Sequence, residues 1–249
     1  MRAAGVAALG VLAAACAGCG GKADPPTPGD ERGAGVGALG GGAEVNTLAR
    51  TRLRERPRGE LGWVADELRL APGEEVEHAH ELAFAYARRG APRVDGEALP
   101  PGAGAAIEPG VRHTHAAADE GSVLWEVRLA APDSPPPRGA ARVRRVFESD
   151  VLEGVPELAA ASFLEVTVPP RGGQTTVHTH PGPESILQLS GRIDYQNAIM
   201  GTKRLRPGAT EAIPPGTAVQ KRNPFAEPAT FLSWFLVDPD RPFAPQASF

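Results

Sequence analysis

The chain has 249 residues, with 26 Lys and Arg against 30 Asp and Glu, so its formal net charge is −4. This weak acidic balance lacks the concentrated basic face that binding to phosphates requires, so we expect no nucleic-acid partner. The 30 Gly and 26 Pro residues disfavour long helices and favour short strands joined by tight turns. Both cysteines, Cys16 and Cys19, lie near the N-terminus, which excludes disulfides, thiolate metal sites and cysteine nucleophiles from the rest of the chain.

The N-terminus has the features of an export signal. Arg2 supplies a positive charge, and the apolar run from Ala3 to Ala15 is shorter than the about 20 residues of a membrane-spanning helix. The run ends at Cys16 in a Leu-Ala-Ala-Ala-Cys sequence that resembles a bacterial lipobox, in which the cysteine is lipidated. Residues 1–19 are therefore predicted to be a signal peptide, with Cys16 as the lipidated residue.

Two alternatives remain for this segment. Cys19 fits the lipobox pattern less well than Cys16, and ordinary signal cleavage would leave both cysteines incidental. Export is expected in every case. The resemblance to a lipoprotein signal implies a location in the periplasm or at the outer membrane, with membrane contact only through the N-terminal lipid anchor.

Residues 20–45 consist mostly of Gly, Ala, Pro and charged residues. Such a segment cannot bury enough apolar surface to offset its chain entropy. We predict a flexible tether here, followed by a folded part that begins between Val45 and Val64.

The rest of the chain contains an internal repeat. Residues 99–113 align without a gap with residues 205–219, with eight of the fifteen positions identical. Upstream, residues 73–80 align with residues 173–180, and both segments end in a His-x-His pair. Two homologous units follow from this repeat. The predicted boundaries are 46–133 for the N-terminal unit, 134–144 for a Pro-rich linker and 145–249 for the C-terminal unit.

Within the units, short runs of β-forming residues alternate with turn residues, which predicts an all-β fold. The expected strands of the second unit are 163–168, 175–180, 185–190 and 231–237, with turns at 181–183, 206–208 and 214–216. The best helical candidate is Asn46 to Leu70, where the helical period is weak. We therefore expect two small β-barrels or sandwiches.

The second unit carries a recognisable pair of motifs. The residues of the first are Gly172, His178, His180, Glu184 and Gly191, and those of the second are Gly208, Pro214, Pro215, Gly216, Val219 and Asn223. In type and spacing they resemble the two motifs of the cupin superfamily, except that cupins have His where Val219 stands. The resemblance covers Leu70 to about Asp240, and the repeat resembles the two-domain bicupins. It implies two tandem double-stranded β-helix (jelly-roll) barrels after a flexible N-terminal segment.

His178, His180 and Glu184 are the predicted metal ligands of the second unit. Residues i and i+2 of a strand face the same side, so both imidazoles are expected to point into the barrel. Two imidazoles and one carboxylate are the set that suits non-haem Fe(II). Because Val219 cannot coordinate a metal, we expect this site to be more open, weaker or empty.

His78, His80 and His113 are the predicted metal ligands of the first unit, where His113 takes the position of Val219. The carboxylate is missing, because aligning the glycines after each His pair puts Ala83 or Phe84 opposite Glu184. We therefore expect a three-His site completed by Glu81 or His115. The alternative is a set of hydrogen-bonded polar residues in a barrel mouth. Neutral imidazoles suit several metals, so Fe, Mn, Zn, Cu and Ni all stay open.

Two functions fit these features. The first is an exported, metal-dependent oxidoreductase of the dioxygenase kind that acts on a small molecule. The second is a non-catalytic cupin module that binds a small ligand or a partner in the periplasm, because fold alone does not fix function. From the bicupin resemblance we expect either a monomer or a homodimer.

Overall fold

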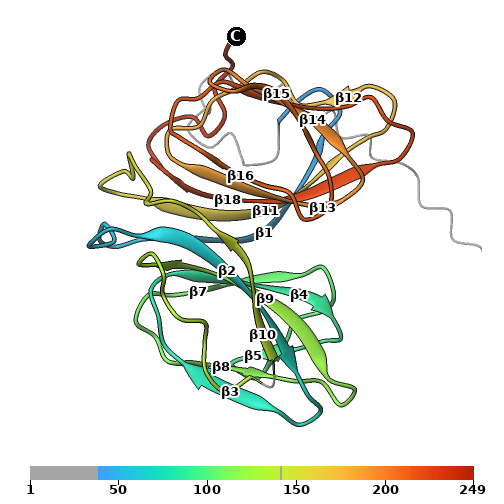
Figure 1. Ribbon diagram of the computed structural model, residues 1–249. Helices are drawn as coiled ribbons and strands as arrows, with labels where there is room; N and C mark the ends of the chain where they lie inside the picture. The colour runs from blue at the N-terminus through green and yellow to red at the C-terminus, as the bar shows by residue number, and fades with distance from the viewer. Residues whose placement is uncertain (1–38, 141) are drawn as a thin grey trace, which may run out of the picture.

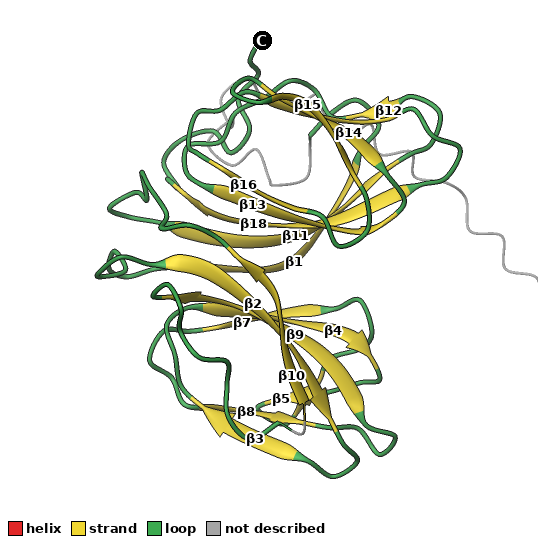
Figure 2. Cartoon of the chain, in the orientation of Figure 1, coloured by secondary structure: helices red, strands yellow, loops and turns green. Residues whose placement is uncertain are grey.

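The structure is a computed structural model that describes residues 39–140 and 142–249. The predicted signal peptide, the lipidation candidate Cys16 and residues 20–38 of the predicted tether lie outside the described residues. The described residues form strands joined by turns and bends (Figure 2), which confirms the predicted all-β class. No helix in this part of the chain has the length and apolarity needed to cross a membrane.

The N-terminal barrel consists of two facing sheets, drawn in the lower half of Figure 1. Its five-stranded sheet has the order β10-β2-β9-β4-β7, and its four-stranded sheet has the order β3-β8-β5-β6. The strands are β2 (Gly62–Leu70), β3 (Glu75–His78), β4 (Ala83–Arg89), β5 (Arg93–Val94), β6 (Glu97–Ala98), β7 (Gly104–Ile107), β8 (His113–Ala116), β9 (Ser122–Ala130) and β10 (Arg142–Glu148).

The C-terminal barrel repeats this arrangement in the upper half of Figure 1. Its five-stranded sheet has the order β1-β11-β18-β13-β16, and its four-stranded sheet has the order β12-β17-β14-β15. The strands are β1 (Glu44–Arg52), β11 (Ala160–Val168), β12 (Gly173–Gln174), β13 (Glu184–Ser190), β14 (Ile193–Asn197), β15 (Gly201–Leu205), β16 (Thr210–Ile213), β17 (Val219–Asn223) and β18 (Ala229–Val237).

The two barrels exchange their outer strands. β1 precedes the N-terminal barrel in sequence but pairs with β11 of the C-terminal barrel, from Glu44↔Thr167 to Arg52↔Ala160. β10 begins at the end of the predicted linker but pairs antiparallel with β2 of the N-terminal barrel. β1 therefore pairs into the C-terminal barrel although most of it lies in the predicted unit 46–133, and β10 pairs into the N-terminal barrel although it runs from the predicted linker into the predicted unit 145–249.

Two further expectations are corrected near the N-terminal end. The weak helical candidate Asn46–Leu70 is wrong, because this segment contains most of β1 and all of β2. The two strands of this segment pair with β11, β9 and β10, and this pairing outweighs the weak helical period. The end of the predicted tether is also ordered: Leu39 is buried against the C-terminal barrel, and its carbonyl accepts hydrogen bonds from the backbone N–H and Oγ1 of Thr176.

The central strands of both five-stranded sheets, such as β9 and β18, are buried on both faces, because the sheets pack against each other as well as closing their own barrels. Leu82, just before β4, and Phe84 and Tyr86 within it belong to the core between the sheets. Ala83, Ala85 and Ala87 alternate with them and face the barrel interior. β18 divides in the same way between the shared core and the C-terminal interior. The period-2 alternation of strands thus serves two cores at once.

Aromatic side chains join the barrels at this shared core. The Phe84 ring of the N-terminal barrel stacks on the Phe163 ring of the C-terminal barrel with centroids 5.1 Å apart. Phe147 on β10 packs edge-on against Trp234 on β18 at 5.2 Å. The Tyr86 hydroxyl also donates a 2.9 Å hydrogen bond to the Glu165 carboxylate across the same boundary. The barrels therefore form one body.

Candidate metal centre

The histidines of the N-terminal barrel come from two paired segments. His78 is the last residue of β3 and lies directly opposite His113, the first residue of β8. His80 follows two residues after His78, and His115 follows two residues after His113. The i, i+2 spacing sends each pair to the same side of the sheet, into the barrel.

A carboxylate from the facing sheet meets them. Glu126 lies in the middle of β9, and it and His113 are almost fully buried. Its Oε2 atom is 2.7 Å from His78 Nε2 and 2.8 Å from His115 Nε2. The same oxygen is 3.4 Å from His80 Nε2 and 3.7 Å from His113 Nε2. One ligand atom from each of His78, His80, His113 and Glu126 lies within 4.8 Å of all the others.

The hydrogen bonds of His80 and His113 show which of their ring nitrogens are free to bind a metal ion. His113 Nδ1 donates to the carbonyl of Val111 at 3.2 Å, and His80 Nδ1 donates to the carbonyl of Glu81. When neutral, these two rings present the lone pairs of Nε2 to Glu126, and both Nε2 atoms are buried without a hydrogen-bond partner. Two lone pairs facing a carboxylate repel one another unless a cation lies between them. The donor set therefore fits a metal ion.

The charges of the cluster are consistent with this assignment. Burial alone would raise the pKa of Glu126, but the four histidines around its carboxylate outweigh burial and hold that pKa well below its usual value. Burial lowers the pKa of His115, so this imidazole stays neutral beside the carboxylate. Burial would also lower the pKa of His113, but the Glu126 carboxylate and the Val111 carbonyl outweigh it and raise that pKa. The carboxylate is thus ionised in a buried site.

The structure brings together the three histidines predicted for this unit and corrects the predicted carboxylate. Glu81 is exposed, and the contact that its backbone carbonyl makes with His80 does not bring its carboxylate to the cluster. Glu126 supplies the carboxylate instead. His115 lies behind Glu126 and donates to it, which is the arrangement of a group that orients a ligand.

The sequence analysis did not identify Glu126, because this carboxylate lies on β9, the strand next to the one that corresponds to the Glu184 strand. Ala83 begins β4 as Glu184 begins β13, and Glu126 lies opposite the third residue of β4, as Ser233 lies opposite the third residue of β13. The sequence offered no carboxylate at the position of Glu184, and only Glu81 and His115 were expected to complete the site. An acidic residue inside the apolar strand 122–130 was the available signal.

The C-terminal barrel has the same frame with different contents. His178 pairs with Val219 through an isolated bridge, and the predicted strand 175–180 is otherwise irregular, which corrects that expectation. His180 Nε2 lies 3.5 Å from Glu184 Oε2. Both oxygens of Glu184 are instead held by Lys221 Nζ, at 3.0 and 3.1 Å. Within the described residues, His178, His180 and Glu184 do not form a cluster of the kind seen around Glu126.

The two histidines of this barrel are held neutral. Burial, followed by the Lys221 ammonium, lowers the pKa of His178 to about 3. Burial also lowers the pKa of His180 to about 4, against the opposing effect of Glu184. Burial would raise the pKa of Glu184, but Lys221 outweighs it and lowers that pKa to about 2. This site therefore contains one anion, one cation and two neutral rings.

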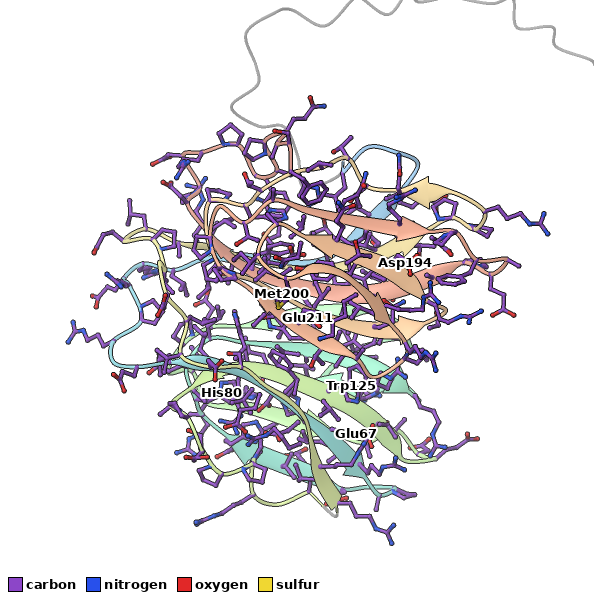
Figure 3. The ribbon with its side chains drawn as sticks, turned by 45° about the horizontal axis from the view of Figure 1, so that its top comes forward. Glu67, His80, Trp125, Asp194, Met200 and Glu211 are labelled. Carbon is purple, nitrogen blue, oxygen red and sulfur yellow. The ribbon has the colours of Figure 1, made fainter. Side chains whose placement is uncertain are left out.

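A pocket of about 460 Å³ lies at the N-terminal barrel, and its lining includes the residues that follow His80 but none of the cluster residues. Glu81 and Leu82, which directly follow His80, form part of its wall, and so does Glu108. Arg52 at the end of β1 and Arg54 in the segment that follows it also line the pocket. Figure 3 labels His80 in the same barrel as Glu67 and Trp125. The volume falls in the range of small-molecule sites.

Comparison with known proteins supports the fold. Residues 164–235 match the family model for the cupin domain. The oxalate decarboxylase of Lactobacillus farciminis in complex with formate shares 16% identity and a TM-score of 0.54, covering 80% of this chain and 88% of that chain. The oxalate decarboxylase of Bacillus subtilis, in a study of its Mn(II) centres, shares 18% identity and a TM-score of 0.54, with coverages of 82% and 74%. No curated protein sequence matches the chain.

The cupin-domain match is confined to residues 164–235, and the likeness to the oxalate decarboxylases shows that the chain shares their fold. The family match falls on the C-terminal barrel, which contains the complete first motif. The cluster of possible metal ligands around Glu126 lies in the N-terminal barrel. The part of the chain that best resembles the family in sequence is therefore not the part with the better metal geometry.

Proposed function

We propose that this protein binds one divalent transition-metal ion per chain in its N-terminal barrel. The proposed ligands are His78, His80, His113 and Glu126. The observation that supports this most strongly is the pair of buried, unpartnered Nε2 atoms of His80 and His113 facing an ionised carboxylate. Three imidazoles and a carboxylate suit Fe, Mn, Zn, Cu or Ni.

A metal held this way would act as a Lewis acid or redox centre for a small molecule. The side chains of His113 and Glu126 are fully enclosed, whereas those of His78 and His80 keep 13% and 9% exposure. Access to the cluster is therefore from the His78 and His80 side. The pocket beside Glu81 provides a place for a polar substrate next to that side.

We propose a metal-dependent oxidoreductase of the dioxygenase kind as the activity, with a non-catalytic ligand-binding module as the alternative. The pocket with charged walls at Glu81, the residue after His80, favours the enzyme. The C-terminal barrel, whose buried charges are already paired, favours a binding or structural role for that half. The solved structures of similar fold are oxalate decarboxylases, so oxalate is the first substrate to test.

Metal analysis of the full chain tests the binding proposal. Purified protein loaded in turn with Fe, Mn, Zn, Cu and Ni should retain about one ion per chain of at least one metal after desalting. His113→Ala should lose this ion, because removing one ligand disrupts the coordination geometry. Sub-stoichiometric retention of every metal by the folded wild type would contradict the proposal.

An activity test separates the two functions. Metal-loaded wild type should consume oxalate or take up oxygen with a small organic acid, and His113→Ala should not. If the loaded protein binds such acids without consuming them, the binding module is the better description.

Export through the N-terminal segment is a further part of the proposal and rests on the sequence of residues 1–19. Wild type should be found with membranes, and Cys16→Ser should release it while the barrels stay folded. Wild-type protein found wholly in the soluble fraction would contradict the lipid anchor.

A further inference from the structure

Lys221 lies in the interior of the C-terminal barrel, at the place where the N-terminal barrel has its cluster. The residue is fully buried, and its Nζ contacts both oxygens of Glu184, at 3.0 and 3.1 Å. The same carboxylate accepts a 2.6 Å hydrogen bond from Ser233 Oγ. Protein side chains therefore bind both oxygens of Glu184.

The strand register shows that this lysine corresponds to a residue of the N-terminal cluster. His78 lies opposite His113, and His178 lies opposite Val219. Two residues beyond these partners come His115 in the first barrel and Lys221 in the second. The neutral ring that contacts Glu126 in one barrel is thus replaced by an ammonium that contacts Glu184 in the other.

The buried side-chain charges in each barrel then determine whether it can bind a divalent metal ion. The N-terminal interior places one carboxylate among four histidines, and the Nε2 atoms of two of these have no partner there. The C-terminal interior already contains one carboxylate and one ammonium. A divalent ion added to this second set would lie next to the Lys221 charge, with little screening by water.

We propose that the Lys221 ammonium is the resident cation of the C-terminal barrel and that it closes a latent metal site formed by His178, His180 and Glu184. His178 and His180 donate their Nδ1 protons to the carbonyls of Thr176 and Phe243, at 2.8 and 2.7 Å. Their Nε2 atoms are buried without a hydrogen-bond partner. Removal of the amine would leave two imidazole lone pairs and a carboxylate, which is a set of three protein ligands that zinc accepts.

This inference does not depend on metal binding by the N-terminal barrel, and the experiment keeps the two apart. Glu126→Gln serves as the background, because it removes the carboxylate of the N-terminal cluster. In this background, zinc binding to the full chain is measured by calorimetry and by metal analysis after desalting. The background alone should bind no zinc in the C-terminal barrel, and adding Lys221→Met should raise the stoichiometry by about one ion per chain over that of the background.

Two further variants show that the gained zinc is bound where we propose. Adding Glu184→Gln to Lys221→Met should abolish the gain, and this double replacement leaves an uncharged pair of similar shape that should fold. Adding His178→Ala to Lys221→Met should weaken zinc binding by more than about 100-fold, since it removes one of three ligands. The melting temperature of Lys221→Met should rise on zinc addition, and that of the background should not.

Three outcomes would overturn the proposal. One is a folded Lys221→Met variant that gains no zinc. Another is a background protein that already binds zinc through His178, with Lys221 in place. The third is a Lys221→Met variant that stays unfolded even with zinc, while the double variant Lys221→Met, Glu184→Gln folds. Zinc would then have failed to neutralise the charge of the Glu184 carboxylate.

Discussion

The two barrels share one frame and differ in a few buried charges. In both, a His-x-His segment meets a strand from the four-stranded sheet, and a residue of the five-stranded sheet completes the interior. The N-terminal barrel places Glu126 among four imidazoles, whereas the C-terminal barrel pairs Glu184 with Lys221. The fold thus fixes where the polar groups converge, and single residues at equivalent positions decide whether a metal is needed there.

The largest effect is expected from separating the halves. A fragment of residues 142–249 lacks β1, so the edge of β11 and the Phe163 side of the shared core would be exposed. An exposed edge and a large apolar face favour self-association. Size-exclusion chromatography of the fragment should show oligomers or aggregate. A monomeric fragment with a sharp melting transition would mean that the barrels are more independent than their strand exchange indicates.

The shared core itself can be weakened in the full chain. Phe163→Ala removes a ring that packs on Phe84 and Trp234, and the resulting cavity should lower the free energy of unfolding by about 3–5 kcal/mol. Denaturant titration followed by fluorescence measures this change. A loss below about 1 kcal/mol would show that the two sheets do not depend on this contact.

Matched ligand replacements should separate the two sites. His113→Ala should weaken metal binding by more than about 100-fold, because a direct ligand is expected to matter more than the groups behind it. His178→Ala, the corresponding change in the C-terminal barrel, should leave metal stoichiometry unchanged because Lys221 supplies the positive charge there. Competition with a chelating dye measures both affinities. The reverse pattern would place the working site in the other barrel.

The pH dependence of stability should also differ between the barrels. The folded pKa values of His178 and His180, about 3 and about 4, lie below the unfolded value of about 6.5. As the pH falls below about 6.5, the unfolded state therefore takes up protons that the folded state does not. The free energy of unfolding of metal-free protein should then decrease, with a slope approaching about 2.7 kcal/mol per pH unit from these two residues.

His113 has the opposite sign, because its folded pKa is raised. Its contribution is present below its unfolded pKa and is lost as the pH rises through its folded pKa. Urea titrations between pH 4 and pH 8 of wild type and His113→Ala, both with chelator, distinguish the contributions. A stability that stays constant down to pH 5 in both proteins would contradict the neutral, buried state of His178 and His180.

The smallest effect is expected from His115. His115 Nε2 donates to Glu126 at 2.8 Å but is not part of the set of ligand atoms that lie within 4.8 Å of one another. His115→Ala should weaken metal binding by about 10–100-fold, as for other groups that orient a ligand, and less than His113→Ala does. Equal losses in the two variants would make His115 a direct ligand.

The sequence predicted the repeat, the all-β fold and the convergence of His78, His80 and His113, because local spacing controls all three. It did not predict Glu126, since the distance from β9 to the histidines depends on how two sheets face each other. The role of Lys221 was hidden for the same reason: its partner Glu184 lies far away in the sequence. Strand exchange depends on nonlocal pairing, so the repeat boundaries alone could not show it.

Anomalous scattering from crystals of the full chain, loaded with Mn or Zn, tests the central claim most directly. The account predicts one strong peak per chain, bound by Nε2 of His78, His80 and His113 and by the Glu126 carboxylate, with Lys221 still paired to Glu184. A peak between His178, His180 and Glu184 with the lysine displaced would contradict it, and so would the absence of any peak at Glu126.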